Sequence, residues 1–371
     1  MKAMLERIDV HRLRVPLATP YKLAFGPVTH FDTIVVHVVD ADGREGFGEA
    51  TVLTGYTDET IDDAWRIACE FATHIGSADS SETDRQVAAL GERYPFTATA
   101  FGTALDMRRG HPALRVREAV RVPLLGLLNA EHAADIEREV EALLAAGFRT
   151  VKVKVGFDHE RDAARVRAIQ RAVAARATIR LDANQGYTAE QGVAFVRALA
   201  PQGIELFEQP CSSGDWDAHL AVARVAEVPM MLDESIYGLA DIDKAARLRA
   251  ASYLKLKLMK LVTLEALSEA IGRLEAAIDR VRALGMQPVL GNGVACDVGC
   301  WMEACVAARA IDNAGEMNGY LKARERLFVQ PLPFERGAIV LEPGFAPALD
   351  PERVARYRVD HASACAMARH A

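Results

Sequence analysis

Thr178-Ile179-Arg180-Leu181-Asp182 is a short apolar run that ends on a carboxylate, and the same pattern recurs twice further along the chain. Ile204-Glu205-Leu206-Phe207-Glu208 and Val228-Pro229-Met230-Met231-Leu232-Asp233 follow it, and Lys257 continues the series. The gaps between these charged residues are 26, 25 and 24 residues, the length of one strand, one helix and two loops. Repetition of that unit predicts a (β/α) barrel, in which the carboxyl-terminal strand ends form one shared active-site face. We therefore expect the three carboxylates and the lysine to converge.

The composition is that of a soluble globular enzyme and excludes several classes of protein. A chain of 371 residues, half of them apolar, is long enough for a large barrel and a smaller unit. A net charge of −7 provides no basic surface for nucleic acid, and no apolar run is long enough to span a membrane. The charged start of the chain predicts no signal peptide, and six cysteines without a CxxC pair indicate neither zinc nor disulfides. These features together predict a cytoplasmic enzyme.

The sequence pattern divides the chain into three parts. Residues 1–118 combine a strand–turn–strand pattern at 33–50 with helical patterns at 58–75 and 82–108, which predicts an α+β unit. Residues 119–328 are expected to form the barrel, and residues 329–371 are expected to fold back on the N-terminal unit. Beyond the strands named above, the barrel segments that we expect are strands near 122–128, 148–155, 286–293 and 314–318 and a helix over 131–146.

Asp182, Glu208 and Asp233 offer three hard oxygen ligands on successive strand ends. Such a set suits Mg²⁺, which binds a few carboxylates and retains waters and a substrate oxygen. Soft or imidazole ligands are absent from these positions, which argues against zinc or copper. The alternative is that acidic residues at strand ends cap the helices that follow, and three in succession make that the weaker interpretation.

Lysines stand on both sides of the predicted carboxylate set. Lys152 and Lys154 are two residues apart on one strand and therefore point to the same face, and Lys257 lies four strands away. Repulsion between ammonium groups, a bound cation and partial burial all lower the pKa of a lysine toward the range of a general base. One lysine can then remove a proton from a carbon and the other can return it to the opposite face. Lys255 and Lys260 are either surface residues or groups that support the site.

These residues resemble the motifs of the enolase superfamily, in particular the muconate lactonizing enzyme-like subgroup of the mandelate racemase/muconate lactonizing enzyme family. The strand 151–156 is similar to its KxK strand, and the segment 256–260 is similar to the strand that carries its second base. Leu181-Asp182-Ala183-Asn184, Phe207-Glu208-Gln209-Pro210 and Leu232-Asp233-Glu234-Ser235 are similar to its three metal-ligand strands. The resemblance covers nearly the whole chain.

The resemblance implies a modified TIM-like barrel whose mouth is covered by the N-terminal α+β capping domain, and it implies a homo-oligomer. It assigns Mg²⁺ to Asp182, Glu208 and Asp233, and the opposed acid/base pair to Lys154 and Lys257. Lys152 is then expected to lower the pKa of Lys154 and to help hold the substrate carboxylate.

The chain departs from the subgroup at three points. Leu261-Val262-Thr263 replaces a pair of glycines after the sixth strand, and the seventh strand carries no histidine. Glu316-Met317-Asn318 stands where dipeptide epimerases of the family carry an Asp-x-Asp that holds the ammonium group of the substrate. A simple dipeptide epimerase is therefore not the expectation, and Glu316 pairs with a cationic amine, caps a helix or is solvated.

The family resemblance places substrate specificity largely in two cap loops, near residues 16–26 and 53–56. Residues on these loops, like Asn292 on the seventh strand, are as readily explained by plain packing as by substrate contact. The full set of candidate substrate-binding residues is Asn184, Glu234, Asn292, Glu316, Asn318, Tyr21, Lys22 and Tyr56.

The predicted function is Mg²⁺-dependent removal of the α-proton of a small-molecule carboxylate by way of an enediolate. With a lysine on each side, racemisation or epimerisation of an amino acid or a derivative is the first expectation. A cycloisomerase or a dehydratase that works by β-elimination is the alternative within this chemistry. A lysine Schiff-base aldolase and a non-catalytic metal- or ligand-binding barrel are the alternatives from other classes.

Overall fold

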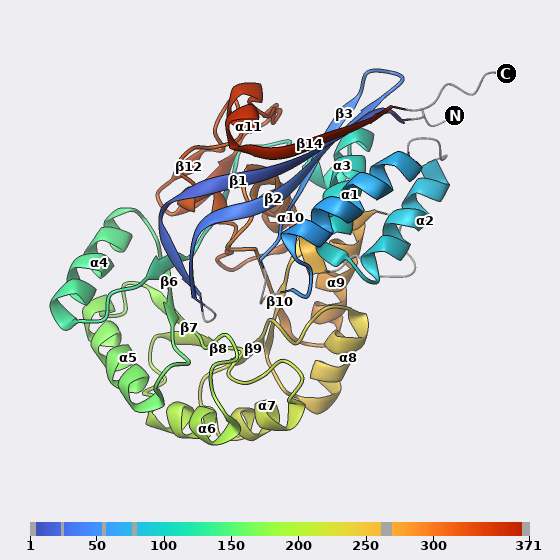
Figure 1. The fold of residues 1–371 in the computed structure, drawn as a ribbon. Helices are drawn as coiled ribbons and strands as arrows, with labels where there is room; N and C mark the ends of the chain where they lie inside the picture. Colours follow the sequence, from blue (N-terminus) through green and yellow to red (C-terminus); the bar gives the residue numbers. More distant parts are fainter. Residues whose placement is uncertain (1–4, 24–25, 54–56, 76–79, 261–268, 366–371) are drawn as a thin grey trace.

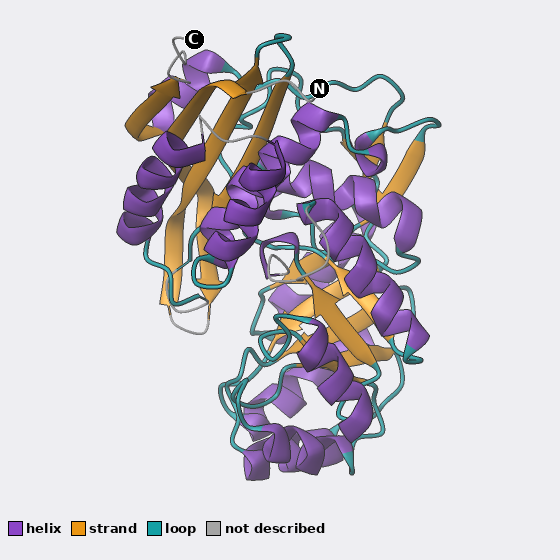
Figure 2. Ribbon diagram, turned by 90° about the vertical axis from the view of Figure 1, so that its right-hand side faces the viewer, coloured by secondary structure: helices purple, strands orange, loops and turns teal. Residues whose placement is uncertain are grey.

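The computed structural model describes residues 5–23, 26–53, 57–75, 80–260 and 269–365, which form a barrel with a second unit, the cap, over one end (Figure 1). The cap contains a four-stranded antiparallel sheet of order β14-β1-β2-β3 (Figure 2). Two helices pack against this sheet, and a third packs against one of them. The elements of the cap are β1 (Leu5–Leu23), β2 (Gly26–Asp40), β3 (Glu45–Thr51), α1 (Ile61–Ile75), α2 (Ser80–Gly91), α3 (Pro95–Arg109) and β14 (Arg358–Cys365).

Two glycines of β3 allow α3 to lie directly on the cap sheet. A Cβ on Gly46 would lie 2.0 Å from the carbonyl oxygen of Ala104, and one on Gly48 would lie 1.9 Å from that of Ala100. Any side chain at either glycine would therefore force the helix away. The predicted helical pattern at 82–108 is divided into α2 and α3 because Pro95 occupies the first turn of α3.

The barrel sheet has seven parallel strands in the order β11-β10-β9-β8-β7-β6-β5. Its strands are short and mostly buried, which is typical of parallel strands covered by helices. The strands are β5 (Gly126–Leu128), β6 (Thr150–Lys154), β7 (Thr178–Asp182), β8 (Ile204–Glu208), β9 (Met230–Leu232), β10 (Tyr253–Leu256) and β11 (Gln287–Leu290).

The expected eighth strand at 314–318 is reduced to a bridge. Gly315 pairs in parallel with Leu124, and the backbone N–H of Glu316 donates to the carbonyl of Leu290 at 3.0 Å. Residues 315–316 therefore fill the gap between β11 and the start of the barrel. The first barrel strand was expected over 122–128, but only its second half enters the barrel.

The first half of that expected strand, β4 (Val120–Pro123), belongs instead to a three-stranded sheet of order β12-β13-β4. Its partners are β12 (Phe334–Glu335) and β13 (Ala338–Leu341), while β14, also from the C-terminal segment, pairs with β1 of the cap. The described part of the C-terminal segment, residues 329–365, thus divides its strand pairing between the cap and the start of the barrel. A short helix, α11 (Pro351–Tyr357), connects the two parts.

Helices surround the barrel on its outer side (Figure 1). Local sequence sets their starts, since Asp158 caps α5 and a Thr188–Gln191 capping box begins α6. They are α4 (Ala133–Ala145), α5 (His159–Val173), α6 (Ala189–Ala198), α7 (Trp216–Ala223), α8 (Leu239–Leu248), α9 (Ala270–Ala283) and α10 (Asp297–Ala310), with 3₁₀ turns η1 (Pro112–Leu114), η2 (Leu258–Lys260) and η3 (Gly319–Lys322).

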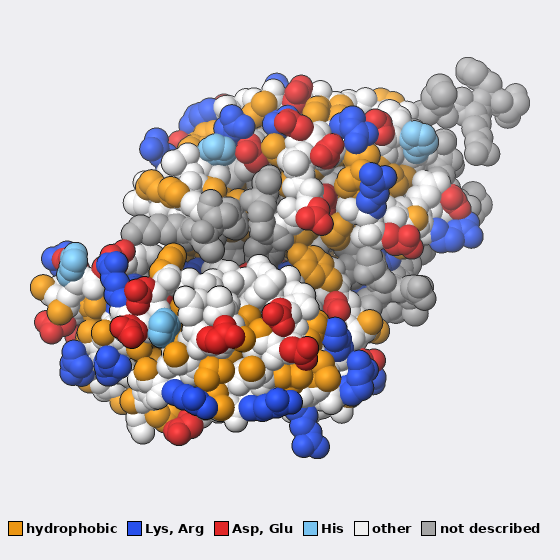
Figure 3. Space-filling view, turned by 60° about the horizontal axis from the view of Figure 1, so that its bottom comes forward, with side chains coloured by type: hydrophobic (Ala, Val, Ile, Leu, Met, Phe, Trp, Pro, Cys, Tyr) orange, Lys and Arg blue, Asp and Glu red, His pale blue; other side chains and the backbone are white. Residues whose placement is uncertain are grey.

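The outer surface of the barrel carries charges of both signs. In the view of Figure 3, lysine and arginine side chains are interspersed with aspartate and glutamate over the barrel helices. Within the part of the chain that the structure describes, no helix has the length and apolar character needed to cross a membrane.

Candidate active site

Three buried carboxylates lie at the ends of adjacent barrel strands. Asp182 and Glu208 are the last residues of β7 and β8 and are partners in the register, and Asp233 follows the last residue of β9. Each of the three residues is at most 1% exposed. Because neighbouring strands of a sheet lie about 4.8 Å apart, the backbone aligns the three carboxylates in one row.

Lys154 and Lys257 stand at the two ends of this row. Lys154 is the last residue of β6, and its Nζ donates to Asp182 Oδ2 at 2.7 Å. Lys257 follows β10, and its Nζ donates to Asp233 Oδ2 at 2.7 Å. The sheet order places the three carboxylate strands between the two lysine strands, so the ammonium groups reach the row from opposite sides.

A second pair of lysines lies below the row, each two residues before one of the first pair. Lys152 Nζ lies 2.7 Å from Asp182 Oδ2 and 2.9 Å from Glu208 Oε2, and Lys255 Nζ lies 3.1 Å from Glu208 Oε1. Both lysines also donate to Glu316 Oε2, at 2.8 Å from Lys152. Lys255 is thus a supporting group rather than a surface residue. Glu316 is buried against two lysines of its own chain, so the expected solvation or helix capping is wrong.

Asn184, Glu234 and Lys260 complete the polar ring around the row. Asn184 accepts a hydrogen bond from the Lys154 ammonium and donates to Glu234 Oε1 at 2.9 Å. Lys260 Nζ donates to Asp233 Oδ1 at 2.7 Å and to the Asp233 carbonyl at 2.6 Å. Asp233 therefore accepts hydrogen bonds from Lys257 and Lys260, and Lys255 Nζ lies 4.0 Å from its Oδ2, which together hold its side chain in place.

Gln209 is a supporting residue that sequence reasoning did not single out. It is fully buried, with a φ of 40°, and its Oε1 accepts the backbone N–H of Asp233 at 2.9 Å. Its Nε2 donates to Ser235 Oγ at 2.8 Å. The only sequence signal for this role was that Gln209 directly follows Glu208, a candidate metal ligand.

The charges around each group determine its ionisation. Burial alone would raise the pKa of Asp182, but the ammonium groups of Lys152 and Lys154 lower it to about 2. Burial lowers the pKa of Lys154, and so does Lys152, as expected from sequence, but the Asp182 carboxylate outweighs them and the net shift is upward. The expected influence of Lys152 is present, but the pKa of Lys154 as a whole is raised rather than lowered.

Lys257 has the opposite shift. Burial lowers its pKa to about 8. The carboxylates of Asp233 and Glu234 oppose this shift, and the neighbouring charges of Lys260 and Lys255 add to it. The two candidate acid/base lysines are thus unequal, with Lys257 the more easily deprotonated.

The carboxylate row has the right chemistry for Mg²⁺ but not the closed geometry of a bound metal. In the described ranges of the chain, no three His, Cys, Asp or Glu side chains are grouped closely enough to hold an ion. The lysines are the physical reason, since each carboxylate is drawn toward an ammonium group. The donors are nevertheless three hard oxygens from adjoining strand ends, with Asp182 and Glu208 already partners in the register. The donor chemistry of these residues therefore fits Mg²⁺.

The predicted substrate contacts from the cap are only partly visible. Tyr21 is 9% exposed, and its ring centroid lies 4.4 Å from Nζ of Lys322, a lysine that sequence reasoning missed because it belongs to no motif. Tyr21 lies on β1, so part of the region expected to be a loop is a strand. Tyr56 and the side chain of Lys22 lie outside the described residues, as do Leu261, Val262 and Thr263.

Asn292 and Asn318 are engaged in contacts with their own chain. Asn292 Oδ1 accepts the backbone N–H of Val294 at 3.1 Å, and its Nδ2 lies 3.4 Å from the sulfur of Met259. Asn318 Nδ2 donates to the carbonyl of Leu125 at 3.2 Å, so it links the segment that closes the barrel to the residue just before β5.

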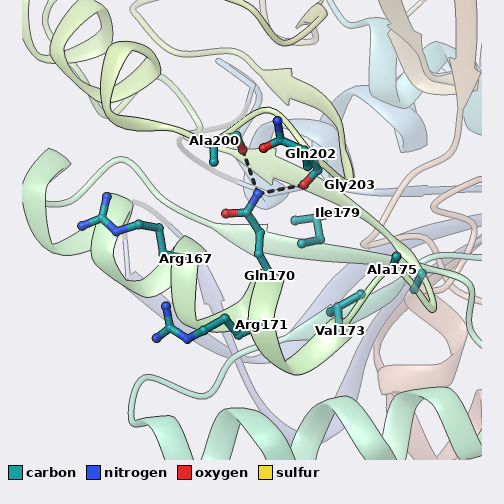
Figure 4. A pocket seen from close by; sticks show the side chains of 10 residues that line it. Arg167, Gln170, Arg171, Val173, Ala175, Ile179, Ala200, Gln202 and Gly203 are labelled. Atoms are coloured by element: carbon teal, nitrogen blue, oxygen red, sulfur yellow. Dashed lines mark hydrogen bonds between the residues drawn. The ribbon is translucent and has the colours of Figure 1, made fainter.

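A hollow of about 400 Å³ lies at the opposite end of the barrel strands (Figure 4). It is lined in part by Ile179, near the start of β7, whereas Asp182 ends that strand. The side chain of Gln170 lines the hollow, and its Nε2 donates to the carbonyl oxygens of Ala200 and Gln202 at 2.7 and 2.8 Å. This end of a TIM barrel serves stability rather than catalysis, so the hollow is separate from the carboxylate row.

Comparison with known proteins gives a consistent result. Residues 135–353 match the family model described as Enolase C-terminal domain-like. The chain is 31% identical to L-Lys-D/L-Arg epimerase of Methylococcus capsulatus, over 68% of this chain and 74% of that protein. It is 26% identical to muconate cycloisomerase 1-2 of Acinetobacter lwoffii, over 96% of each. A dipeptide epimerase from Cytophaga hutchinsonii, solved with Mg and the dipeptide D-Ala-L-Val, shares the fold with a TM-score of 0.84 at 20% identity, over 97% of this chain and 99% of that one.

Proposed function

This chain belongs to the enolase C-terminal domain-like family, and on that premise we propose that it is an isomerase that removes and returns the α-proton of a carboxylate substrate. The observation that carries the proposal is the row Lys154–Asp182–Glu208–Asp233–Lys257, in which two lysines flank three buried carboxylates. A proton acceptor on one side and a donor on the other is what inversion at a carbon requires.

Lys154 and Lys257 exchange roles according to the enantiomer that binds. The lysine that faces the α-hydrogen accepts it on Nζ, and the ammonium on the other side donates a proton to the opposite face. Lys152 keeps a positive charge beneath the row, which favours the carboxylate of the substrate, and Asn184 orients Lys154.

We propose that Asp182, Glu208 and Asp233 hold Mg²⁺. When bound, the ion supplies positive charge that stabilises the enediolate formed as the α-proton leaves. The neighbour solved with Mg supports this assignment, together with the hard oxygen donors of the row.

Racemisation or epimerisation of an amino acid derivative is the favoured reaction, since L-Lys-D/L-Arg epimerase of Methylococcus capsulatus is 31% identical to this chain. Cycloisomerisation is the second candidate, because the muconate cycloisomerase aligns over 96% of the chain. The binding of Glu316 by Lys152 and Lys255 also leaves no obvious place for a substrate ammonium there. A dehydratase or a non-catalytic barrel is less well supported. A homo-oligomeric state and a cytoplasmic location stay predictions.

Deuterium uptake from D₂O tests the proposal. Amino acids, N-acyl amino acids, dipeptides and dicarboxylates are incubated with the enzyme and Mg²⁺, and the α-carbon is followed by NMR and mass spectrometry. The expected result is the uptake of one deuterium at the α-carbon with Mg²⁺ present, and no uptake when EDTA is added. A change of skeleton seen by NMR selects cycloisomerisation, and exchange that persists in EDTA contradicts the metal assignment.

A further inference from the structure

Lys322 differs from every other lysine at the barrel mouth that the structure describes. It is the last residue of η3, and its Nζ donates to Asn318 Oδ1 at 2.8 Å and to the carbonyl oxygen of Gly293. Both partners are neutral, and no carboxylate oxygen of the described residues lies within 4.0 Å of this ammonium group. By contrast, a carboxylate oxygen lies within that distance for each of Lys152, Lys154, Lys255, Lys257 and Lys260.

The cap fixes the position of this lysine. The register of β1 with β2 shifts between Pro16 and Tyr21, and Leu17, within the shift, forms a bridge with Ala323 instead. The backbone N–H of Arg324 donates to the carbonyl of Pro16 at 2.9 Å. The segment that carries Lys322 is therefore held against the cap strand, and the ring of Tyr21 covers the ammonium group.

Lys322 lies beside the carboxylate row without belonging to it. A Cβ placed on Gly293 would lie 2.9 Å from Glu316 Oε1 and 3.4 Å from Lys322 Nζ, so the two head groups flank this glycine. The other oxygen of Glu316 accepts from Lys152 and Lys255. Glu316 thus separates Lys322 from the inner lysines, and its charge is already shared by two of them.

Lys322 is half-buried. An ammonium group that is partly withdrawn from water and has only neutral hydrogen-bond acceptors lacks a counter-charge, which is energetically unfavourable. Burial lowers the pKa of Lys322 to about 7, and Glu316 only partly opposes the shift. A ligand carboxylate at this point would supply the missing counter-charge through a charge-assisted hydrogen bond. A ligand ammonium group would meet like charge instead.

We propose that Lys322 binds a second carboxylate of the substrate, remote from the reacting α-carbon, so that the enzyme selects dicarboxylate amino acid substrates. This inference rests on the proposed function and names the substrate class. The second carboxylate lies either in an N-acyl group or in the amino acid side chain. Tyr21 and Asn318 position the ammonium group that recognises it.

Two matched pairs of compounds separate these sources. N-Succinyl-L-alanine and N-acetyl-L-alanine differ by a carboxylate on the acyl group, and L-glutamate and L-glutamine differ by one on the side chain. We expect the wild type to favour the dianion of one pair by about 10- to 100-fold in kcat/KM for α-proton exchange, as for a hydrogen bond to a charged group. The pair that shows the preference identifies the source.

Variants then assign the preference to Lys322. Lys322→Met should reduce the ratio within that pair to about one, chiefly through KM, and Lys322→Arg should preserve it. Lys244→Met is the matched control, because Lys244 also lies over an aromatic ring, 4.3 Å from the centroid of Trp216, but on α8 outside the barrel. A wild-type ratio of about one in both pairs, or an equal loss for both members in Lys322→Met, overturns the proposal.

Calorimetric binding of the same four compounds separates this inference from the proposed function. If no compound exchanges but the wild type binds the dianion more tightly and Lys322→Met does not, the carboxylate site stands and the proposed function fails. If exchange occurs with no preference in binding or in rate, the carboxylate site fails alone. If the compounds neither bind nor exchange, both are rejected.

Discussion

The barrel mouth and the joint between cap and barrel both bury carboxylates, and different partners balance them in the two regions. At the mouth, burial raises the pKa of Asp182, but Lys152 and Lys154 bring it down to about 2. At the joint, Glu49 of β3 accepts backbone N–H groups at the start of α10, including that of Val298 at 3.0 Å. Burial raises the pKa of Glu49 to about 8, because these donors carry no full charge.

The carboxylates at the mouth belong to the candidate active site, whereas those at the joint hold the cap and the barrel together. Lysines hold the pKa values of Asp182 and Asp233 below their usual range, so both stay ionised near neutral pH, the state that a cation requires. Burial and the charge of Asp182 raise the pKa of Glu208 instead. At the joint, Glu49 and Asp106 satisfy the free N–H groups that every helix start presents. Loss of charge at the mouth should therefore abolish activity, and loss of charge at the joint should change stability alone.

The largest expected effect is the loss of either flanking lysine. Lys154→Met and Lys257→Met should each lower racemisation about 1,000-fold, within the range of a missing general acid or base. Each variant should still exchange the α-proton of the enantiomer that faces its remaining lysine. Chiral chromatography and deuterium exchange measure the two effects, with Lys244→Met as control. Racemisation within 10-fold of wild type in both variants would contradict the two-lysine mechanism.

Removal of a mouth carboxylate should have the next largest effect, this time on stability. Asp182→Asn removes the carboxylate that pairs with Lys154 and one of the three that pair with Lys152, so the free energy of unfolding should fall by about 3–5 kcal/mol. The control is Asp243→Asn, which breaks a half-exposed pair with Arg280 and should change it by less than about 1 kcal/mol. Equal effects in urea denaturation would show that the mouth pairs contribute no more than surface pairs.

The joint should be destabilised as pH rises. Glu49 has a pKa of about 8 in the folded state against an ordinary value of 4.5, so between these values the folded protein holds a proton that the unfolded chain has lost. Its contribution to stability is complete below pH 4.5 and is lost as pH rises toward 8. The neighbouring Asp297 carboxylate raises the pKa in the same direction.

Glu49→Gln tests this dependence because glutamine keeps an acceptor but does not titrate. The melting temperature of the variant relative to wild type should rise from about pH 5.5 to about pH 8. Glu118→Gln, at an exposed position, is the control. A difference that is constant over this range would show that Glu49 is ionised throughout.

The smallest expected effect concerns the second carboxylate of the joint. Asp106 of α3 accepts the backbone N–H of Ile271 at the start of α9, at 2.8 Å. Asp106→Ala leaves that N–H without its acceptor and should reduce stability by about 1 kcal/mol, the usual effect of a lost helix cap. Asp106→Asn keeps an acceptor and should lose less. Equal losses in denaturant titrations would assign the effect to charge rather than to capping.

The strands and the metal-ligand candidates could be found in the sequence because they repeat. A carboxylate or lysine at the end of an apolar run, every 24 to 28 residues, reflects the strand–helix unit and the shared direction of the strands. Asp182, Glu208, Asp233, Lys154 and Lys257 were all identified in this way. The hairpin of β2 and β3 could also be found from local sequence, since an Asp-Gly turn follows a run of β-branched residues.

Long-range pairing decided what the pattern missed. Gly315 closes the barrel through a single bridge to Leu124, and β4 lies outside the barrel, where it pairs with β13. In both cases the backbone groups pair with segments that are far away along the chain. No local period predicts such a partner.

The sequence by itself thus determined which residues carry the chemistry and which strand each one ends. Only the tertiary structure decided that Glu316 neutralises Lys152 and Lys255, that Lys257 and Lys154 have opposite pKa shifts, and that Lys322 lies under Tyr21. The physical reason is that strand and helix periods are local properties of the chain. The electrostatic environment of a buried group depends instead on neighbours that folding brings together from distant segments.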